Sequence, residues 1–324
     1  MIFESLPTTP RSSELIDKAF SRAARAGRAK SGLKAQQSML QTASSILSDN
    51  LENVVTQWPD FETVDPFYYE LADAIVDVDA LRQSLSRVTW TSRQIGTLRR
   101  EYQSKLRKTE SETARKHRKQ AFARMADLVE DVADDLKQIG SARDAVKDLP
   151  DIRPDEPAIV VAGYPNVGKS SFVNTVTRAD NEIAHYPFTT TGIHVGHFDH
   201  DRIRYQIVDT PGLLDRPAAE RNDIERQAVS AVEHLADVIL FMSDASEACG
   251  YPLTEQLALR DDIMERFRER EIPVLTVNNK SDRSEEITAD CQMSIKYNEG
   301  IDNVITTTVD AAGWEPDIPP SRQA

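Results

Sequence analysis

The first half of the chain has its hydrophobic positions at helical spacing and contains very few glycines. In the segment DPFYYELADAIVDVDAL, Asp65 is suited to cap a helix and Pro66 to occupy its first position. An apolar stripe then follows the helical period at Phe67, Leu71, Ile75 and Val78. Segments of this kind between residues 10 and 148 predict an all-α helical-bundle domain of about four to five antiparallel helices.

The hydrophobic pattern changes in the middle of the chain. The stretch LPDIRPDEP, residues 149–157, contains three prolines and no apolar period, which is typical of a linker. Beyond it, short runs such as AIVVAG and DVILFMSDA alternate with helical segments such as DIERQAVSAVEHLAD. Buried strands separated by helices predict a mostly parallel sheet with helices on both faces. We therefore predict a helical domain over residues 1–148 and an α/β domain over residues 158–324.

The charge of the chain is divided unevenly between these two parts. The formal net charge of the 324 residues is −14, but residues 1–150 carry 23 Lys/Arg against 22 Asp/Glu, whereas residues 151–324 carry 16 against 31. Arg outnumbers Lys 27 to 12, and Asp outnumbers Glu 30 to 23. An acidic, Asp-rich and Lys-poor composition favours a protein kept soluble in high salt, such as the cytosol of a halophile. An ordinary acidic cytosolic protein is the alternative.

Cysteine usage and hydropathy indicate a cytoplasmic protein. Cys249 and Cys291 do not form a CxxC pair, which favours reduced thiols. The N-terminal MIFESLPTTP has neither the basic region nor the hydrophobic region of a secretory signal. No apolar run approaches the roughly 20 residues that a membrane-spanning helix requires, so we expect no membrane association.

The motif that says most about function is GYPNVGKSS, which begins at Gly163 and fits G-x-x-x-x-G-K-[ST]. It follows a predicted strand and precedes a helical segment, as a phosphate-binding P-loop requires. We expect Lys169 to reach the β- and γ-phosphates of a nucleotide and the Ser170 hydroxyl to bind Mg²⁺. Backbone N–H groups of the loop would surround the phosphate oxygens. The residues expected to contact phosphates are Asn166, Val167, Gly168, Lys169, Ser170 and Ser171.

Two later segments complete a predicted phosphate and magnesium site. In DTPGLLDRP, Asp209 ends a predicted strand, where its carboxylate can hold Mg²⁺ through water, and Gly212 can offer its N–H to the γ-phosphate. In YPFTTTG, one threonine should cover both Mg²⁺ and the γ-phosphate. Thr189, Thr190 and Thr191 are the candidates, and we prefer Thr190. The predicted metal ligands are therefore Ser170, Thr190 and Asp209.

The segment NKSD, residues 279–282, predicts that the bound base is guanine. The Asp282 carboxylate can accept hydrogen bonds from the ring N–H and the exocyclic amine of guanine, and adenine offers neither. Asn279 would support the loop, and Lys280 would pack its aliphatic stem along the base. The residues Ser294, Ile295 and Lys296 stand where GTPases usually show Ser-Ala-Lys, whose backbone contacts guanine.

These motifs resemble the nucleolar GTP-binding protein 1 family, which belongs to the Obg-related P-loop GTPases. The resemblance rests on GYPNVGKSSFVN, YPFTTTGIHVGHF, QIVDTPGLLDRP, HLADVILFMSDASEACGY and NKSD. The tract SEACGY, residues 246–251, is a more specific marker than the general GTPase motifs. The chain is similar to the short archaeal members. The resemblance implies a P-loop GTPase domain over residues 158–324 that acts in maturation of the large ribosomal subunit. Contacts made through the long C-terminal extension of eukaryotic members are not implied.

One position departs from the pattern of many GTPases. Leu213 follows Gly212, where other GTPases often carry a Gln that orients the attacking water. Obg-like families commonly carry an apolar residue there, so catalysis is expected to rest on Lys169, Asn166, Thr190 and Gly212. In related GTPases with Asn at the place of Asn166, a bound K⁺ lies near the bridging phosphate oxygen; the alternative is that Asn166 only caps the loop. We expect slow hydrolysis, stimulated by K⁺ or by a ribosomal partner.

A basic tract runs from Arg82 to Arg124, with 13 Lys/Arg and three acidic residues. Positive charge concentrated on helices suits the phosphate backbone of structured RNA. The family resemblance favours rRNA and precursors of the large ribosomal subunit as partners, and we expect no DNA partner. A solvated helix face, or neutralisation of the acidic domain, is the alternative. The candidate RNA contacts are Arg99, Arg100, Lys105, Lys108, Arg115, Lys116, Arg118 and Lys119.

Other classes of function fit the sequence less well. A nucleotide-dependent RNA or protein scaffold with negligible GTP turnover stays open because of Leu213. A signalling or membrane-associated G protein lacks support, since no lipidation cysteine lies near either terminus. In HVGHFDH, the spacing of three places the middle one of His194, His197 and His200 on the opposite strand face, so we expect no zinc site there.

Overall fold

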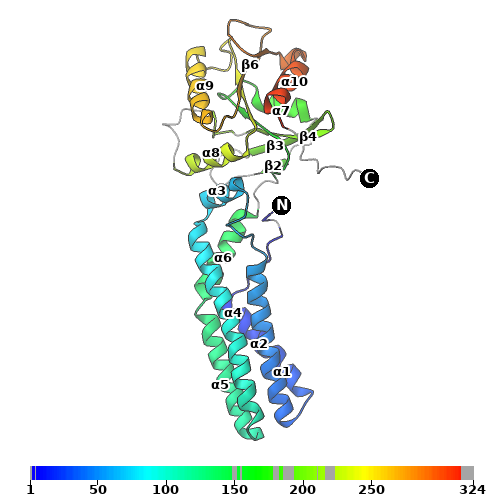
Figure 1. The fold of residues 1–324 in the computed structure, drawn as a ribbon, viewed down its shortest axis with the longest axis vertical. Helices are drawn as coiled ribbons and strands as arrows, with labels where there is room; N and C mark the ends of the chain where they lie inside the picture. The colour runs from blue at the N-terminus through cyan, green and yellow to red at the C-terminus, as the bar shows by residue number, and fades with distance from the viewer. Residues whose placement is uncertain are drawn as a thin grey trace, which may run out of the picture. The chain divides into compact units, whose positions relative to one another are not determined.

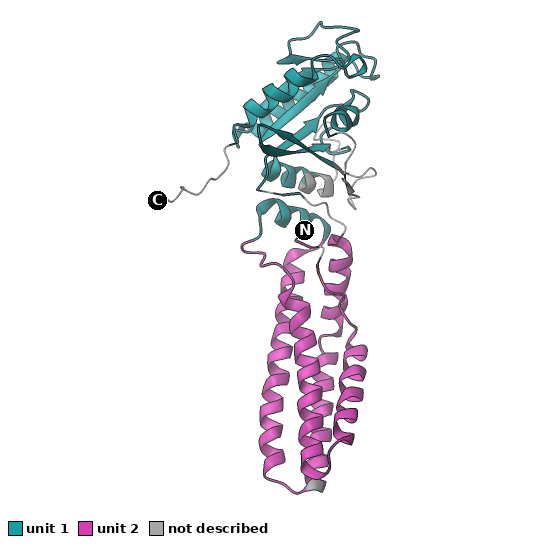
Figure 2. Cartoon of the chain, turned by 90° about the vertical axis from the view of Figure 1, so that its right-hand side faces the viewer, with its two compact units in different colours: residues 1, 64–75, 148–324 teal, residues 2–63, 76–147 magenta. Residues whose placement is uncertain are grey.

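The computed structural model divides the chain into two compact units (Figure 2). The helical unit consists of residues 2–63 and 76–147, and the sheet unit consists of residues 64–75 together with the chain from residue 148 onward. The residues whose structure is described are 2–3, 5–147, 152–153, 155–177, 182–184, 193–209, 211–215 and 223–314.

Five helices form the helical unit within these described residues. α1 packs against α2, α2 against α4, and α4 against both α5 and α6. Their buried side chains recur at helical spacing, as Leu40, Leu47 and Leu51 of α2 show. The predicted all-α bundle is confirmed. The five helices (Figure 1) are α1 (Ser12–Arg28), α2 (Gly32–Thr56), α4 (Val78–Arg107), α5 (Ser111–Glu130) and α6 (Ala133–Val146).

The helix α3 (Pro66–Ile75) belongs to the sheet unit, although its neighbours in the sequence belong to the helical unit. It packs against α8 (Asp223–Leu235). The Tyr68 hydroxyl of α3 also donates a hydrogen bond to the carbonyl oxygen of Ile152. The observed division therefore departs from the predicted helical domain of residues 1–148 at this helix, because α3 buries its apolar face in the other unit.

The apolar stripe predicted to run on to Val78 is interrupted. Helix α3 ends at Ile75, and Asp77 caps the following helix by accepting a hydrogen bond from the backbone N of Ala80 at 2.8 Å. Ile75 and Val78 are three residues apart, so the spacing of apolar positions continues although the helix itself does not. The prediction of one helix carrying the whole stripe is therefore wrong at this point.

The sheet unit contains a seven-stranded sheet in the order β2-β3-β4-β1-β5-β6-β7. The central strand β1 pairs in parallel with β4 and β5, and β6 and β7 continue in the same direction. β3 runs antiparallel to both of its neighbours, β2 and β4. The strands are β1 (Ala158–Ala162), β2 (Glu182–Ala184), β3 (Ile193–His200), β4 (Ile203–Asp209), β5 (Val238–Ser243), β6 (Val274–Asn278) and β7 (Cys291–Gln292).

Helices cover both faces of this sheet. Every residue of β1 and β5 is buried, which requires cover on both sides. In Figure 1, α8 and α9 lie on one side of the strands and α7 and α10 on the other. The predicted α/β fold with a mostly parallel sheet is confirmed. The further helices are α7 (Lys169–Thr177), α9 (Leu253–Arg268), the short 3₁₀ helix η2 (Ile295–Tyr297) and α10 (Ile301–Ala312).

The predicted linker is bonded to the sheet unit in its described residues. The buried Gln206 of β4 donates from Nε2 to the carbonyl oxygens of Arg153 at 2.6 Å and Glu156 at 3.0 Å. Its Oε1 accepts from the backbone N of Arg153 at 2.8 Å. Residues 152–153 and 155–157 are therefore part of the folded unit and do not form a free spacer.

The carboxyl ends of the parallel strands meet at one edge of the sheet. The register pairs Val161 of β1 with Asp209 of β4, and Ser243 of β5 with Asn278 of β6. The loops that follow β1, β4 and β6 contain predicted nucleotide motifs, and the loop after β5 contains the tract SEACGY. Motifs that are far apart in the sequence therefore converge at the edge where α/β sheets bind their ligands.

Candidate guanine-nucleotide site

The loop between β1 and α7 has a backbone conformation that few residue types tolerate. Gly163 and Gly168 have φ angles of 130° and 113°, and Asn166 has a φ of 63°. A Cβ atom would lie 2.3 Å from the carbonyl oxygen of Met242 at the first glycine and 2.3 Å from Nδ2 of Asn279 at the second. Both glycines of the predicted P-loop are thus required by conformation and by space.

Lys169 is enclosed by the P-loop. Only 8% of its surface is exposed, and Nζ donates to the carbonyl oxygens of Gly163 at 2.6 Å and Tyr164 at 3.0 Å. Burial lowers the pKa of this ammonium group, while the carboxylates of Asp209 and Asp215 act in the opposite direction. A buried cation at the N-terminus of α7 fits a site for an anion such as a phosphate.

The structure brings together two of the three predicted magnesium ligands. The Ser170 hydroxyl at the start of α7 donates to Oδ2 of Asp209 at 2.5 Å, and Asp209 is fully buried at the end of β4. A hydroxyl and a carboxylate are oxygen ligands of the kind that Mg²⁺ prefers. Thr190, with its alternatives Thr189 and Thr191, lies outside the described residues.

The turn of residues 211–215 lies against the P-loop. The backbone N of Gly163 donates to the carbonyl oxygen of Leu214 at 3.1 Å. Leu213 is fully buried, so its side chain does not extend to a position where it could orient water. The backbone N of Gly212, predicted to face the γ-phosphate, donates to Oδ2 of Asp215 at 2.8 Å. Asp215 was not among the predicted site residues. The one feature of the sequence that could have indicated it is an acidic residue three positions after the glycine of DTPG.

The predicted guanine-binding residues line a cavity of about 340 Å³. Asp282 accepts a hydrogen bond from the hydroxyl of Ser294 at 2.6 Å, and Ser294 is itself fully buried. Val167 is buried beside this cavity and contributes only its backbone to the contacts described below. The lining residues are Asn166, Gly168, Ser171, Asn279, Lys280, Asp282, Arg283, Ser294, Ile295 and Lys296.

Asn279 connects the loops on either side of this cavity. Its Nδ2 donates to the carbonyl oxygen of Val167 in the P-loop at 2.8 Å. Its Oδ1 accepts from the backbone N of Ile295 at 3.3 Å. The predicted supporting role of Asn279 therefore extends to both the phosphate-binding loop and the predicted base-binding segment.

A third loop, residues 244–251 after β5, supports the same site. Buried Asp244 binds Nζ of Lys280 at 2.6 Å, and Lys280 also donates to the carbonyl oxygen of Asn166 at 3.0 Å. Burial opposes ionisation of Asp244, but the hydrogen bonds from Lys280 and Ser246 together hold its pKa below the ordinary value. In the sequence this loop is recognisable only as a family marker, and no motif there indicates the role of Asp244.

Aromatic packing joins this loop to the P-loop as well. The rings of Tyr251 and Tyr164 lie with their centroids 4.4 Å apart. Buried Gln256 of α9 holds the loop in place, since its Oε1 accepts from the backbone N of Asp244 at 2.8 Å and its Nε2 donates to the carbonyl oxygen of Tyr251 at 2.9 Å. Residues 244–251 are thus a rigid support for the nucleotide site.

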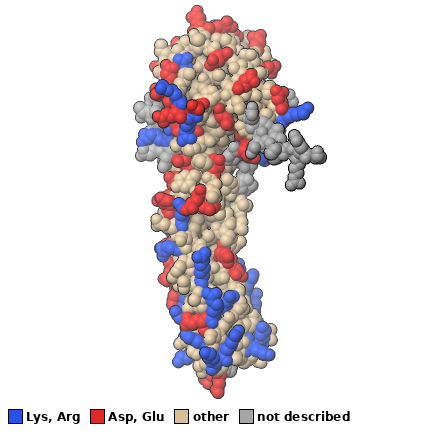
Figure 3. Space-filling model, viewed as in Figure 1, with Lys and Arg blue, Asp and Glu red and all other residues tan. Residues whose placement is uncertain are grey.

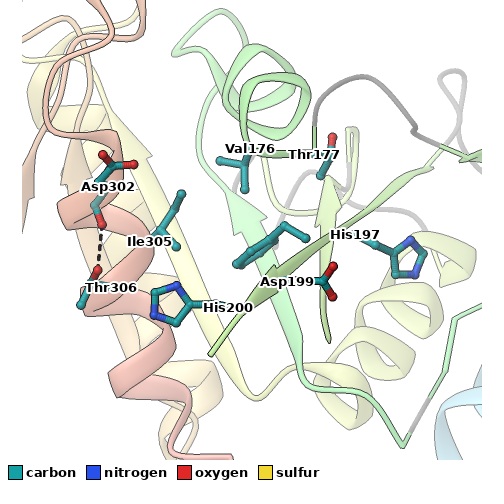
Figure 4. Close-up of a pocket in the computed structure, with 9 residues that line it drawn as sticks. Val176, Thr177, His197, Asp199, His200, Asp302, Ile305 and Thr306 are labelled. Atoms are coloured by element: carbon teal, nitrogen blue, oxygen red, sulfur yellow. Dashed lines mark hydrogen bonds between the residues drawn. The ribbon is translucent and has the colours of Figure 1, made fainter. Parts of the chain in front are cut away.

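A cavity of about 530 Å³ between β3, α7 and α10 lies apart from these loops (Figure 4). Two of the three histidines considered above line it, and the side chains of His197 and His200 point in different directions. Nowhere in the described part of the chain do three or more His, Cys, Asp or Glu side chains form a group able to hold a metal ion.

The candidate RNA contacts lie on the C-terminal half of α4, on the first half of α5 and in the turn between them. Arg118 is partly buried, with its Nε bonded to Gln36 at 2.8 Å and its guanidinium over the Phe122 ring. Arg99 is partly buried too, and Lys105 is bonded to Glu101 at 2.6 Å. The other candidates are exposed: Arg100, Lys108, Arg115, Lys116 and Lys119.

The same end of the helical unit carries basic residues that the sequence analysis did not include. They lie at the end of α1, at the start of α2 and in the turn between these helices, and α1 and α2 both pack against α5. Figure 3 shows Lys and Arg gathered over this end of the unit. The exposed additional residues are Arg22, Arg25, Arg28, Lys30 and Lys34.

Comparison with known proteins identifies both parts of the chain. Residues 3–153 match the model of the NOG1 N-terminal helical domain, and residues 158–280 match the model of the 50S ribosome-binding GTPase. The chain belongs to the nucleolar GTP-binding protein 1 family. Within it, a helical domain precedes a GTPase domain that binds guanine nucleotide, as the sequence motifs predicted.

Relatives in this family cover different shares of the chain. A protein of Methanocaldococcus jannaschii described as uncharacterized is 38% identical over 294 residues, which are 88% of this chain and 82% of the relative. Nucleolar GTP-binding protein 1 of Drosophila melanogaster is 36% identical over 235 residues, or 72% of this chain, and that of Caenorhabditis elegans is 38% identical over 237 residues, or 73%. The chain spans only 36% and 34% of the length of these two relatives.

One solved structure of a family member matches about half of the chain. The crystal structure of a nucleolar GTP-binding protein 1 from Plasmodium falciparum is 34% identical, covers 51% of this chain and 90% of its own, and has a TM-score of 0.46. None of the helices that the structure describes has the apolar length needed to cross a bilayer.

Proposed function

We propose that this chain is a slow, GTP-hydrolysing switch that acts in assembly of the large ribosomal subunit. The observation that carries the proposal is the bridge made by Asn279, which ties the P-loop to the segment beside Asp282 around one cavity. This bridge places a predicted phosphate site next to a predicted guanine site. The ribosomal part is supported by the match of residues 158–280 to the 50S ribosome-binding GTPase family and by the relatives named nucleolar GTP-binding protein 1.

The residues of the site are suited to hold the phosphates and to stabilise charge. The ammonium group of Lys169 and the backbone N–H groups at the start of α7 would bind phosphate oxygens. Mg²⁺, held by Ser170, Asp209 and the proposed Thr190, supplies neutralisation of phosphate charge when it is bound. Positioning and charge stabilisation are the main requirements of phosphoryl transfer, so the buried Leu213 is compatible with slow hydrolysis.

We further propose that K⁺ bound at Asn166 assists hydrolysis. Asn166 is exposed at the rim of the cavity, in a left-handed conformation that Gly also tolerates. Turnover in KCl is expected to exceed turnover in NaCl of equal ionic strength by about tenfold, because a contact to developing charge is worth up to ~10²–10³ in rate. The variant Asn166→Gly should lose this difference and keep the loop conformation. Equal wild-type rates in the two salts would favour the alternative, in which Asn166 only caps the loop.

The helical unit is proposed to contact rRNA through the exposed basic residues at the α1–α2 and α4–α5 turns. Phosphate release under multiple turnover, measured with purified large-subunit precursors, should rise at least about tenfold over the protein alone. The salt should match the native cytosol, because high salt weakens phosphate contacts. Release that stays negligible with particles and K⁺ would favour a second function, a nucleotide-dependent scaffold. This function stays open because Leu213 stands where other GTPases often carry the Gln that orients water.

A matched pair of variants separates rRNA contact from general charge effects. Lys116→Gln with Lys119→Gln removes two exposed charges from α5, and Arg202→Gln with Arg268→Gln removes two exposed charges from the sheet unit. The first pair is expected to weaken binding of rRNA fragments. It should also reduce the magnitude of the slope of log K against log[salt] by about one to two. The second pair should leave both quantities unchanged. An equal effect of the two pairs would contradict contact through α5.

A further inference from the structure

The carboxylate of Asp215 accepts a hydrogen bond from the Gly212 N–H, the group that is predicted to bind the γ-phosphate. The N–H of Gly212 donates to Oδ2 of Asp215 at 2.8 Å. A carboxylate oxygen and a phosphate oxygen are both anionic acceptors, and they compete for one donor. Within the described turn of residues 211–215, Asp215 is the only charged residue.

The rest of the turn holds Asp215 at this place. The carbonyl oxygen of Leu214 accepts from the backbone N of Gly163 at 3.1 Å, so the turn is bonded to the first residue of the P-loop. The side chains of Leu213 and Leu214 are both buried. The turn is therefore fixed by packing on one side and by a backbone hydrogen bond on the other, and its only charged side chain turns back to Gly212.

The charge of Asp215 also acts on the P-loop lysine. Burial of Lys169 disfavours its positive charge, and attraction to the carboxylates of Asp209 and then Asp215 favours it. Asp209 is bonded to the Ser170 hydroxyl, whereas Asp215 is bonded to the Gly212 amide. Two groups predicted to bind the terminal phosphate of GTP, the Lys169 ammonium and the Gly212 N–H, thus already interact with Asp215.

We propose that Asp215 is a specificity-determining residue that sets the preference of this protein between GDP and GTP. This inference rests on the proposed binding of guanine nucleotides. GTP has to displace the Asp215 carboxylate from the Gly212 amide and meets its negative charge near Lys169. GDP has no γ-phosphate and leaves the hydrogen bond in place. Since a ligand shifts a conformational equilibrium only through its different affinity for the two states, GTP releases the turn and GDP retains it.

The test compares Asp215→Asn with the wild-type chain. Asn keeps the size and the acceptor oxygen but removes the negative charge, so affinity for a non-hydrolysable GTP analogue should rise about tenfold, since a nearby like charge disfavours an anion. Affinity for GDP should change less than about twofold. Both affinities are measured by calorimetric titration in Mg²⁺, and the exposed Asp261→Asn on α9 serves as a matched control that should change neither.

A second measurement does not depend on GTP analogues. Beryllium fluoride added to the GDP complex supplies an anion at the place of the γ-phosphate, and Asp215→Asn should bind it more tightly than the wild type does. Equal changes of GDP and GTP-analogue affinity, or no change in either anion experiment, would overturn the role of Asp215. Failure of the wild-type chain to bind either nucleotide would instead overturn the proposed nucleotide binding itself. Circular dichroism of both variants shows whether the fold is retained; if Asp215→Asn is misfolded, the comparison is repeated with Asp215→Ala, for which the same shift is expected.

Discussion

Replacing Asp282 with Asn is expected to lower the affinity for GDP by about 10³-fold and to make XDP the better ligand. The structure holds the carboxylate at the cavity through the hydrogen bond from buried Ser294 at 2.6 Å. A site built to accept hydrogen bonds rejects a ligand that leaves buried polar groups unpaired, by up to ~10⁴–10⁵. Xanthine has a carbonyl where guanine has an amine, and the Asn side chain can donate to this carbonyl.

The measurement is a competition titration of GDP, XDP and ADP against one fluorescent nucleotide. Ser294→Ala is the control, because it removes only the hydrogen bond that orients Asp282. We expect it to weaken GDP binding about tenfold, near the value of one hydrogen bond to a charged group, with no gain for XDP. A variant Asp282→Asn that still prefers GDP would contradict the assignment of Asp282 to the base.

Replacing Asp244 with Asn is expected to lower the free energy of unfolding of the sheet unit by about 2–3 kcal/mol. Removing one member of a buried ion pair leaves the other charge uncompensated and typically costs ~3–5 kcal/mol. The smaller value is expected here because the side chain of Lys280 is 24% exposed, whereas that of Asp244 is fully buried. Urea unfolding followed by circular dichroism gives the free energies.

The stability that the Asp244–Lys280 ion pair contributes depends on pH, and the sign of this dependence follows from the pKa of Asp244. The pKa of Asp244 is lowered in the folded chain, so its contribution to stability is present above the unfolded value of about 4 and is lost as the pH falls through the lower folded value. The wild type should therefore lose more stability than Asp244→Asn on acidification below about pH 4.

A double-mutant cycle tests whether Asp244 acts through Lys280. Lys280→Met alone also breaks the pair, and the double variant should be less destabilised than the sum of the single variants. Both single variants should weaken GDP and GTP binding to a similar extent, because Lys280 also holds the carbonyl of Asn166 at the cavity. Additive effects on stability and on affinity would show that the two side chains act independently.

Sequence reasoning recovered the parts of the site that local motifs specify. The spacing of GYPNVGKSS demands glycines at Gly163 and Gly168, and the structure shows why. A Cβ would overlap the Met242 carbonyl of β5 at the first position and the Asn279 side chain after β6 at the second. The convergence of the motifs also follows from the sequence. Loops after neighbouring parallel strands meet at one edge of a sheet, so Asp209 reaches Ser170.

Sequence reasoning did not recover the residues whose roles depend on contacts between loops. Asp215 and Asp244 carry no motif of their own, and nothing in their spacing says which N–H or ammonium group they meet. The packing of α3 was not predicted for a related reason, although the family model of the N-terminal helical domain spans residues 3–153. The apolar period from Ile75 to Val78 is the same with or without a break. Packing against α8 and the hydrogen bond from Tyr68 to Ile152 assign α3 to the sheet unit.

The basic surface was recovered only in part. The tract on α4 and α5 is dense enough to be seen in the sequence, but the exposed basic residues from Arg22 to Lys34 lie in another hairpin. An antiparallel bundle brings the two turns to one end, where Arg118 in the first half of α5 donates a hydrogen bond to Gln36 near the start of α2. The basic residues of the α1–α2 hairpin thus join this surface through three-dimensional packing, which local charge density in the sequence does not show.

The insertion of α3 into the sheet unit has a consequence for how such a protein can evolve. The chain passes between the units around residues 63, 75 and 147, so neither unit is a continuous segment. Recombination at the proline-rich stretch of residues 149–157 would carry α3 away from α8 and leave apolar surface on both products. The GTPase and the bundle are therefore poor modules for domain shuffling, and the pair is expected to be inherited as one block.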